Sequence, residues 1–407
     1  MHDIRLQLRT PRLLKGANGW WYLGRRRPVR LSAASVDATG NLHPEVARQL
    51  QSAGVDEPTP LPPYALTVLT ATACNLGCAY CFQNTAPDQT GGNRPPRIAA
   101  ATLSRQTADS ILRFVSARMA AAGLTKLHVH IFGGEPLLNP AGCRDLLDLA
   151  GDHGLASALL TTNGTLLTPA IARELSGLGL RHVQVTFDGD RMAHDRTRVR
   201  RSGGGTFDQI LTNMAAASEA SPLRWLLRVN VSQLNRGGIP QLIYRIAQRV
   251  DPGRCHIAFV RVMDTGVGFS DALPNDLALA EEFAAWTIQA HELGFGINEP
   301  RAAQACSSCG FRDGRLGAVV NADGTLYSCW ESAGKPGWEV GTTETGYLPP
   351  KHVNGRWVAC GYEDCAGDAT AASRFQDAVD ARVLDYLYET GQLGQRANNV
   401  EQVAQTS

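Results

Sequence analysis

The stretch ALTVLTATACNLGCAYCF, residues 65 to 82, joins an apolar, β-like run to three closely spaced cysteines. Three residues separate Cys74 from Cys78, and two residues separate Cys78 from Cys81. A short run rich in apolar and β-branched residues favours a buried strand. The three thiols are therefore expected on the loop that follows a strand, and the rest of the chain decides which fold carries that loop.

The composition is that of a globular protein without a strong net charge. The chain has 407 residues, 43% of them hydrophobic, with 39 Lys and Arg against 38 Asp and Glu. So balanced a charge creates no field that would attract nucleic acid or an anionic membrane. The start of the sequence shows no apolar signal region, and no run approaches the length of a membrane span. A cytoplasmic location is therefore expected.

Strand-like and helix-like segments alternate from residue 64 to about residue 293. Such an alternation is typical of parallel sheets, so the expected fold class is α/β, as a partial or full (β/α) barrel of about six parallel strands. In such a barrel the functional loops follow the carboxyl ends of the strands. The expected strands are residues 65–71, 127–132, 156–162, 182–187, 225–231 and 256–262, and the expected helices are residues 103–122, 141–152, 207–220, 239–250 and 277–293.

The segments on either side of the barrel differ from it in composition. Residues 1–63 are expected to form a small α+β unit that ends in a Pro-rich linker, and its basic face either is simply solvated or binds an acidic leader peptide. That face consists of Arg25, Arg26, Arg27 and Arg30. The remaining expected divisions are the barrel at residues 64–297, a cysteine-rich extension at residues 298–391 and a tail at residues 392–407.

The number of thiols on the first loop indicates the chemistry expected there. In a reducing compartment, clustered cysteines are metal ligands more often than disulfide partners. A [4Fe-4S] cluster held by three thiolates keeps one iron without a protein ligand. Because an open coordination position is where a small molecule binds and is activated, Cys74, Cys78 and Cys81 are expected to hold a reactive cluster. A zinc knuckle with a distant fourth ligand is the alternative.

The spacing C-x3-C-x-aromatic-C, with Tyr80 as the aromatic residue, resembles the signature of the radical S-adenosylmethionine (SAM) enzymes. The resemblance extends over roughly residues 64 to 365. It implies that the amino and carboxylate groups of SAM chelate the open iron. It also implies that one electron from the cluster cleaves SAM to a 5′-deoxyadenosyl radical, which abstracts a hydrogen from the substrate.

Further loops at the expected strand ends resemble the same family. GGEP, residues 133–136, resembles the motif that holds the SAM amino group, and its glycines let the backbone approach a ligand closely. TTNG and FDG, residues 161–164 and 187–189, resemble loops near the SAM ribose and the substrate, with ordinary turns as the alternative. Arg228, expected to point inward, would pair with the SAM carboxylate or form a plain salt bridge. The expected SAM-binding set is Tyr80, Gly133, Gly134, Glu135, Pro136, Asn163 and Arg228, and Asp188 is the candidate catalytic residue.

A second set of cysteines follows the barrel. Fourteen residues separate Cys309 from Gly324 and four residues separate Gly324 from Cys329, around a hairpin expected at residues 317–330. This spacing resembles the opening of the SPASM domain of radical SAM peptide maturases. The full downstream run of cysteines is missing, so the extension resembles the shorter twitch domain. Its cysteines suffice for one auxiliary [4Fe-4S] cluster, with a structural zinc site as the alternative. Four of the following five would be ligands: Cys306, Cys309, Cys329, Cys360 and Cys365.

These features predict a radical SAM oxidoreductase that modifies a ribosomally made precursor peptide, most simply by an intramolecular cross-link. The segments at residues 194–198, 204–208 and 227–235 resemble the peptide-modifying branch in particular. The expected partners are the peptide and an electron donor such as a flavodoxin or ferredoxin, with no nucleic acid and no membrane. A small-molecule radical SAM dehydrogenase or cyclase with a twitch extension is one alternative, and a non-catalytic zinc protein is another.

Overall fold

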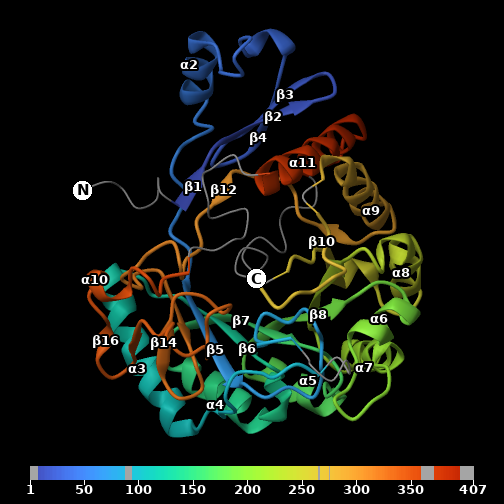
Figure 1. Cartoon of the computed structure of the whole chain (residues 1–407). Helices are drawn as coiled ribbons and strands as arrows, with labels where there is room; N and C mark the ends of the chain where they lie inside the picture. Colours follow the sequence, from blue (N-terminus) through green and yellow to red (C-terminus); the bar gives the residue numbers. More distant parts are fainter. Residues whose placement is uncertain (1–7, 88–93, 265, 275, 359–370, 395–407) are drawn as a thin grey trace.

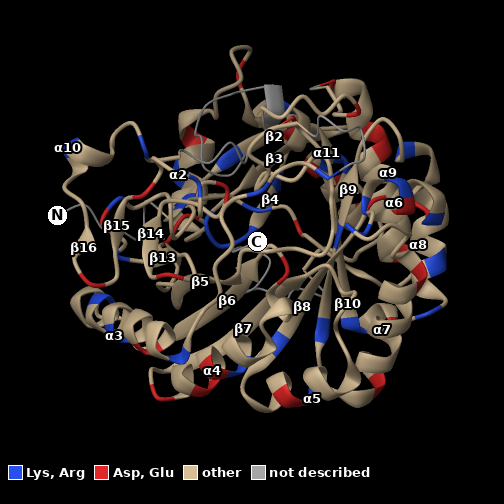
Figure 2. Ribbon diagram, turned by 60° about the horizontal axis from the view of Figure 1, so that its bottom comes forward, with Lys and Arg blue, Asp and Glu red and all other residues tan. Residues whose placement is uncertain are grey.

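The computed structural model describes residues 8–87, 94–264, 266–274, 276–358 and 371–394. A curved sheet with helices on its outer side forms most of the molecule (Figure 1). Basic and acidic residues are both spread over the ribbon (Figure 2), as the balanced composition predicts. Within the described residues, no helix is long and apolar enough to span a bilayer.

Six parallel strands follow one another in chain order through the centre of the sheet, and each is paired with the next. This arrangement confirms the predicted α/β class. Each strand begins and ends within two residues of its expected position. The strands are β5 (Tyr64–Ala71), β6 (Leu127–Gly133), β7 (Leu155–Thr162), β8 (Leu180–Phe187), β9 (Arg224–Val231) and β10 (Cys255–Arg261).

The helices between the strands cover the outer face of the sheet (Figure 1). Ser104 starts the first of them by accepting a hydrogen bond from the Thr107 amide at 3.1 Å, a typical N-cap. The helix expected at residues 277–293 begins with a 3-10 turn, η5 (Leu277–Leu279), and α5 and α6 were not expected. The helices are α3 (Arg105–Ala122), α4 (Pro140–Gly151), α5 (Pro169–Gly177), α6 (Arg191–Thr197), α7 (Phe207–Ala220), α8 (Ile239–Ala247) and α9 (Ala280–Glu292).

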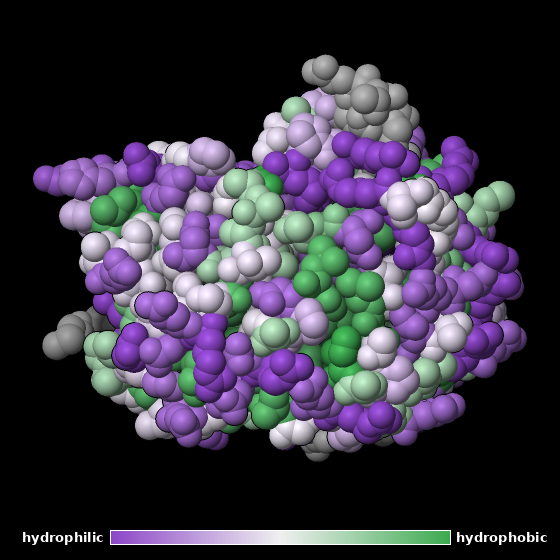
Figure 3. All heavy atoms as spheres, turned by 90° about the horizontal axis from the view of Figure 1, so that it is seen from below, coloured by the Kyte–Doolittle hydropathy of each residue, from purple (hydrophilic) through white to green (hydrophobic). Residues whose placement is uncertain are grey.

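The two faces of the sheet differ because side chains alternate along a strand. In β6, Val129 and Ile131 join the large apolar core between sheet and helices. Phe132 packs with Leu69 of β5 on the other face. On the same inner face, His130 Nε2 lies 2.8 Å from Thr161 Oγ1 of β7. The inner face therefore carries polar groups, while the outer face supplies the core. Seen from below, the surface of the molecule mixes hydrophilic and hydrophobic residues (Figure 3).

The cysteine-rich extension continues the sheet of the barrel. β13 (Gly317–Val320) pairs in parallel with β5, and β14 (Thr325–Tyr327) returns antiparallel to it. Gly324, at φ +86°, completes the turn of this expected hairpin. The sheet ends at β11 (Gly296–Ile297) on one side. On the other side it ends with β15 (Gly341–Thr342) and β16 (Gly346–Tyr347), followed by α10 (Pro350–Val353). The loop after β5 and the hairpin after β13 therefore leave neighbouring strands.

The N-terminal segment forms a separate antiparallel sheet of β2 (Arg12–Gly16), β3 (Gly19–Leu23) and β4 (Pro28–Leu31), followed by η1 (Ala33–Ser35) and α2 (Pro44–Ser52). Just before it, β1 (Arg9–Thr10) pairs with β12 (Ala303–Gln304). A helix that the sequence did not indicate, α11 (Ala371–Glu389), lies beside this sheet (Figure 1). Leu14 and Trp21 pack against Leu384 of α11, and Trp21 Nε1 donates to Asp385 Oδ1 at 2.8 Å.

Candidate active site

A cavity lies on the inner side of the barrel sheet, where the predicted loops meet. Three short segments line it together: the cysteine loop after β5, the GG pair after β6 and the TTN segment at the end of β7. Arg228 of β9 also lines it, so its side chain points inward as expected. The predicted residues that line the cavity are Cys74, Cys78, Tyr80, Cys81, Gly133, Gly134, Asn163 and Arg228.

Backbone hydrogen bonds from a distant segment hold the cysteine loop. The amide of Gly77 donates to Val199 O at 2.9 Å, and the amide of Arg201 donates to Asn75 O, also at 2.9 Å. Asn84 Nδ2 donates to Cys78 O at 3.0 Å within the loop. The loop is therefore fixed by the connection between α6 and α7 as well as by its own residues.

Burial keeps two of the loop thiols from ionising easily. It raises the pKa of Cys78 to about 12 and also raises the pKa of Cys74, although nearby arginines act in the opposite direction. Cysteine binds metal as the thiolate, so a metal centre must displace these protons and supply the positive charge that stabilises the buried thiolates. The donor set therefore fits an iron–sulfur cluster, which supplies that positive charge.

A four-iron cluster and a single zinc ion place different demands on the spacing of their ligands. Among the described residues, no three His, Cys, Asp or Glu side chains converge as the ligands of one metal ion do. A tetrahedral zinc ion needs its ligands within about 2.3 Å of one point. A four-iron cluster instead binds each thiolate to a different iron, so its ligands lie farther apart. The described residues thus contain no preformed site for a single metal ion, and the binding of a four-iron cluster by the three thiols remains a prediction.

Gly133 and Gly134 are required for a different reason from the one that the sequence suggested. A Cβ atom on Gly133 would lie 2.2 Å from Ala71 O, and one on Gly134 would lie 2.4 Å from Ala73 O. Gly133 also has a φ of +148°, which side chains rarely allow. Both glycines line the cavity, but close contact with the backbone of the neighbouring strand and loop already excludes larger residues.

Glu135 and Pro136, which the sequence predicts to bind SAM, are not among the residues that line the described cavity. Glu135 is fully buried and accepts three hydrogen bonds from the chain itself. Its Oε1 accepts from Thr162 Oγ1 at 2.7 Å and from the Leu137 amide at 3.0 Å, and its Oε2 accepts from the Asn163 amide at 2.7 Å. Pro136 begins a buried 3-10 turn, η2 (Pro136–Leu138). Glu135 therefore positions the loop after β7.

Asn163 connects that loop to the cysteine loop. Its Nδ2 donates to Asn75 Oδ1 at 2.8 Å and lies 3.9 Å from Cys74 Sγ. Its Oδ1 accepts from the amide and the hydroxyl of Thr165 at 3.0 and 2.7 Å. Both ends of the amide are thus used, and Asn163 is held in one orientation at the cavity wall.

Asp188 lies behind the described cavity lining rather than in it, which argues against direct contact with substrate. The Tyr80 hydroxyl donates to Asp188 Oδ2 at 2.7 Å and accepts from Arg198 Nη1 at 2.9 Å and Asn230 Nδ2 at 3.0 Å. Burial raises the pKa of Asp188, and the Arg198 charge and the Tyr80 hydroxyl oppose this increase. The sequence analysis assigned no role to Arg198 or Asn230, although it singled out the segments that contain them.

The second cysteine set approaches the same cavity from the extension. Cys309 and Cys329 are buried together, and Cys306 packs against them. Cys360 and Cys365 lie outside the described residues. Trp330 and Glu331, directly after Cys329, line the cavity, and the Trp330 ring lies 6.5 Å from that of His130. The first thiol set therefore lines the cavity, while the second set reaches it through Trp330 and Glu331 and has no described cysteine in the lining.

Arg261 is another cation in the cavity lining that the sequence did not indicate. Arg261, at the end of β10, lines the cavity, and its guanidinium lies 4.1 Å from the centre of the Phe375 ring in α11. Arg228 Nε donates to Asn230 Oδ1 at 2.9 Å. The cavity wall thus carries two cations on neighbouring strands, and α11 supports one of them.

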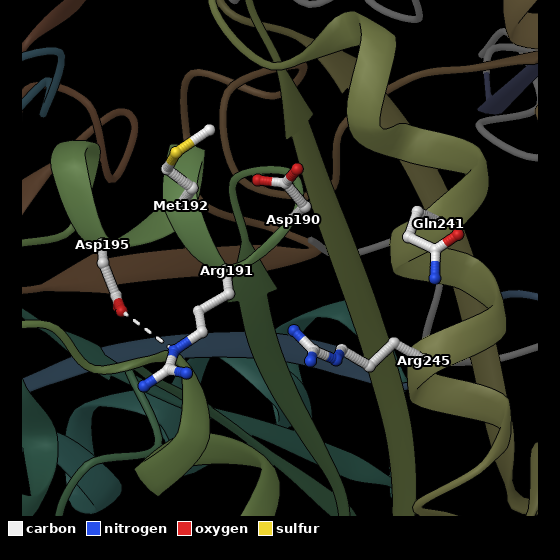
Figure 4. Close-up of a pocket in the computed structure, with 6 residues that line it drawn as sticks. All are labelled: Asp190, Arg191, Met192, Asp195, Gln241 and Arg245. Carbon is white, nitrogen blue, oxygen red and sulfur yellow. Dashed lines mark ion pairs between the residues drawn. The ribbon is translucent and has the colours of Figure 1, made fainter.

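A second hollow lies on the outer surface beside α6 and α8 and has a volume of about 450 Å³ (Figure 4). Its lining mixes charged and polar groups, and Arg191 Nε lies 3.9 Å from an Asp195 carboxylate oxygen. None of the described cysteines lines it, so it offers no site for the chemistry above. Its lining is Asp190, Arg191, Met192, Asp195, Gln241 and Arg245.

Comparison with known proteins gives the class of this chain. Residues 68–235 match the family model of the radical SAM superfamily. GTP 3′,8-cyclase of Xanthomonas campestris pv. campestris (strain 8004) is 30% identical over 278 residues, which cover 63% of this chain and 76% of the relative. The chain therefore belongs to the radical SAM superfamily. It is an enzyme of the kind that uses a [4Fe-4S] cluster and SAM.

More distant similarities include a maturase and two proteins whose structures contain a bound peptide. Mycofactocin maturase MftC of Mycolicibacterium smegmatis is 25% identical over 281 residues, 66% of this chain and 64% of the relative. The structure of anSMEcpe with bound AdoMet and Cp18Cys peptide is 16% identical, covers 81% of this chain and 99% of that chain, and has a TM-score of 0.59. Streptococcus suis SuiB bound to precursor peptide SuiA is 14% identical, with 87% and 91% coverage and a TM-score of 0.51. The two structures support the fold.

Proposed function

We propose that this radical SAM enzyme modifies a precursor peptide with the help of a second, auxiliary [4Fe-4S] cluster. One observation carries the proposal: Trp330 and Glu331, which directly follow Cys329, line the same cavity as Cys74, Cys78 and Cys81. A cluster at Cys329 would thus lie next to the substrate. Four of Cys306, Cys309, Cys329, Cys360 and Cys365 would hold it, in an extension comprising residues 298–391.

The residues of the cavity divide between cluster and SAM. Cys74, Cys78 and Cys81 hold the first cluster, while Gly133, Gly134, Asn163 and Arg228 bind SAM. When bound, cluster and SAM supply a radical that removes a hydrogen atom from the substrate. Tyr80 keeps the loop in place through its hydroxyl contacts with Asp188, Arg198 and Asn230. Glu135 positions Asn163 from behind.

A peptide substrate is supported by the similarity to structures of peptide-bound enzymes and by the N-terminal unit, residues 1–63. The described strand order of its sheet ends at β4, whose outer edge offers main-chain groups to an added strand. The basic face contributes less than its composition suggests. Arg25 Nη1 donates to Asp56 O at 3.1 Å, and Arg26 pairs with Glu57 at 3.0 Å. Leader binding would therefore rely mainly on the strand edge.

The reaction also needs an electron donor, and a flavodoxin or ferredoxin of the reducing cytoplasm would serve. Iron–sulfur clusters of this kind have low potentials, so the donor must be a low-potential carrier. Neither a nucleic acid nor a membrane is required. The product most consistent with an auxiliary cluster beside the cavity is an intramolecular cross-link, because forming it removes two electrons from the peptide.

A second candidate function is cyclisation of a phosphorylated small molecule. The 30% identity to GTP 3′,8-cyclase favours it, as do Arg228 and Arg261, since guanidinium groups bind phosphate oxygens in pairs. In this case the extension would act as a twitch domain that holds the substrate near the auxiliary cluster.

One experiment separates the two candidates. The anaerobically reconstituted protein is incubated with SAM and dithionite, together with either GTP or the peptide encoded by a short reading frame beside its gene. Mass spectrometry is expected to show the peptide lighter by two hydrogens and GTP unchanged. The Cys306→Ala, Cys309→Ala, Cys329→Ala variant is the control. A cyclised GTP product with an unmodified peptide would overturn the peptide proposal and support the second candidate.

A further inference from the structure

Arg97 lies beside the thiols of the first loop and belongs to none of the segments that indicated the family. Its Nη1 donates to Cys81 Sγ at 3.3 Å, and its Nη2 donates to Gln83 Oε1. Gln83 is 2% exposed, and the side chain of Arg97 lines the cavity. The guanidinium is therefore held between a thiol of the loop and a buried amide.

The backbone fixes this arrangement as firmly as the side chains do. The Ile98 amide donates to Gln83 O at 3.3 Å, and the Thr85 amide donates to Pro96 O at 2.9 Å. The segment before α3 thus runs antiparallel to the end of the cysteine loop, with a bridge between Asn84 and Arg97. Arg97 reaches the thiols from a rigid position, so its contact with Cys81 follows from the fold.

Arg97 brings a permanent positive charge to the thiols of the loop. Its guanidinium donates to Cys81, and its side chain lines the same cavity as Cys74 and Cys78. A guanidinium keeps its proton in proteins, so this charge stays beside the thiols. Arg198, the other cation near the loop, interacts most directly with Tyr80 and acts on Cys78. Arg97 is thus the described cation whose side chain donates directly to one of the three thiols.

We propose that Arg97 is a positioning residue that raises the reduction potential of the cluster at Cys74, Cys78 and Cys81. Reduction takes one electron from an external low-potential donor and adds one negative charge to the cluster. A fixed cation and a hydrogen bond to a ligand sulfur stabilise the more negative, reduced state, and both are known to set cluster potentials. Because the potential governs how readily SAM is cleaved, Arg97 would make the cluster reducible by weaker donors.

The test is a redox titration of the whole reconstituted enzyme in which electron paramagnetic resonance monitors the reduced cluster. Addition of SAM perturbs the signal of the open-iron cluster and so identifies it. We expect Arg97→Gln to lower the ratio of reduced to oxidised cluster about tenfold at a fixed applied potential. This corresponds to a decrease of about 59 mV in the midpoint potential of the one-electron couple. Arg97→Lys should restore part of the loss, because it keeps the charge without the planar fork.

Two further variants keep the result interpretable. Gln83→Met removes the second partner of the guanidinium and should shift the potential in the same direction by a smaller factor. Arg228→Gln is the matched control: this residue lines the same cavity, and its described side-chain donor bond goes to Asn230. We expect Arg228→Gln to weaken SAM binding and leave the potential unchanged, the reverse of Arg97→Gln.

The proposal would be overturned if fully loaded Arg97→Gln showed a ratio of reduced to oxidised cluster within twofold of the parent ratio at the same potential. If Arg97→Gln does not load its cluster, the comparison of Gln83→Met with the parent decides in the same way. The inference rests on the first cluster alone. Failure of the peptide assay would therefore leave it standing, and an unchanged potential would leave the peptide proposal standing.

Discussion

The two cysteine-bearing regions border one cavity but are built in different ways. The first places three thiols within eight residues of one loop, which the connection between α6 and α7 holds through backbone hydrogen bonds. The second gathers Cys306, Cys309 and Cys329 from both sides of the β13–β14 hairpin, where Cys309 and Cys329 are buried and Cys306 and Trp330 pack against them. The thiols of the first region line the cavity directly. The second region contributes Trp330 and Glu331 to the lining.

The difference indicates a division of labour between the two regions. A cluster with three thiolates needs access to the cavity, because its open iron must meet SAM. A cluster with four thiolates is complete without a ligand, so it can be covered by protein and still exchange electrons with the cavity. Since β5 and β13 are neighbouring strands, the fold brings both regions to the same place without a long connection.

The largest effect is expected from removing the first set of thiols. Replacing Cys74, Cys78 and Cys81 together by Ala should abolish SAM cleavage, because no ligands remain for the open-iron cluster. The variant should retain about four iron atoms, since the second set of ligands is intact. Chromatography of 5′-deoxyadenosine under reducing conditions provides the measurement. Continued production of 5′-deoxyadenosine would show that the catalytic site lies elsewhere.

Removing the second set of thiols should separate cleavage from modification. With Cys306, Cys309 and Cys329 replaced by Ala, SAM cleavage without substrate should stay within a few-fold of the parent rate. Modification of the peptide should be lost, because electrons from the substrate have no acceptor. The two activities are followed in one reaction by mass spectrometry. Full peptide modification by this variant would remove the auxiliary cluster from the mechanism.

A smaller effect is expected from removing hydrogen bonds that hold the cysteine loop of the first region in place. Tyr80→Phe removes a buried hydroxyl that contacts Asp188, Arg198 and Asn230. Leaving such groups without a partner costs about 1–3 kcal/mol, so the thermal midpoint and the cluster occupancy should both fall. Tyr244→Phe is the matched control, because Tyr244 is 49% exposed. Equal thermal midpoints in the two variants would show that the Tyr80 hydroxyl does not stabilise the loop.

The smallest effect is expected from the basic face of the N-terminal unit. Arg26→Gln with Arg27→Gln should weaken binding of the neighbouring-gene peptide by less than about 1 kcal/mol per charge and flatten its salt dependence. Arg25 and Arg30 are left in place, because they contact Asp56 and the Tyr388 ring. Arg48→Gln, on α2 of the same unit, is the control for fluorescence anisotropy. A loss well above about thirtyfold in the double variant, which corresponds to more than about 2 kcal/mol, would mean that charge, rather than the strand edge, dominates binding.

The sequence predicted the barrel well because its signals are local. Apolar runs of strand length and amphipathic runs of helix length follow one another, so β5 to β10 could be placed to within two residues. The cysteine spacing is also local, and it identified the three thiols that line the cavity. α11 was missed because its role depends on contacts with Trp21 and Phe283, which are distant in sequence.

The parts of the site that depend on long-range contacts could not be predicted. Glu135 seemed a ligand-binding residue in its motif, yet partners 27 and 28 residues away in sequence turn it toward the loop after β7. Arg97 stands in a segment without a motif, and its importance follows from the pairing of that segment with the cysteine loop. Such roles arise from tertiary structure and leave no local pattern.

The most direct test of the two-region account is the metal content of the anaerobically reconstituted chain. Two [4Fe-4S] clusters predict about eight iron atoms and eight sulfides per chain, and about four of each when either set of three cysteines is replaced by Ala. The account also predicts that SAM changes the spectrum of the variant that retains Cys74, Cys78 and Cys81, but leaves that of the other variant unaltered. About four iron atoms in the parent protein, or zinc in place of iron in the second region, would contradict it.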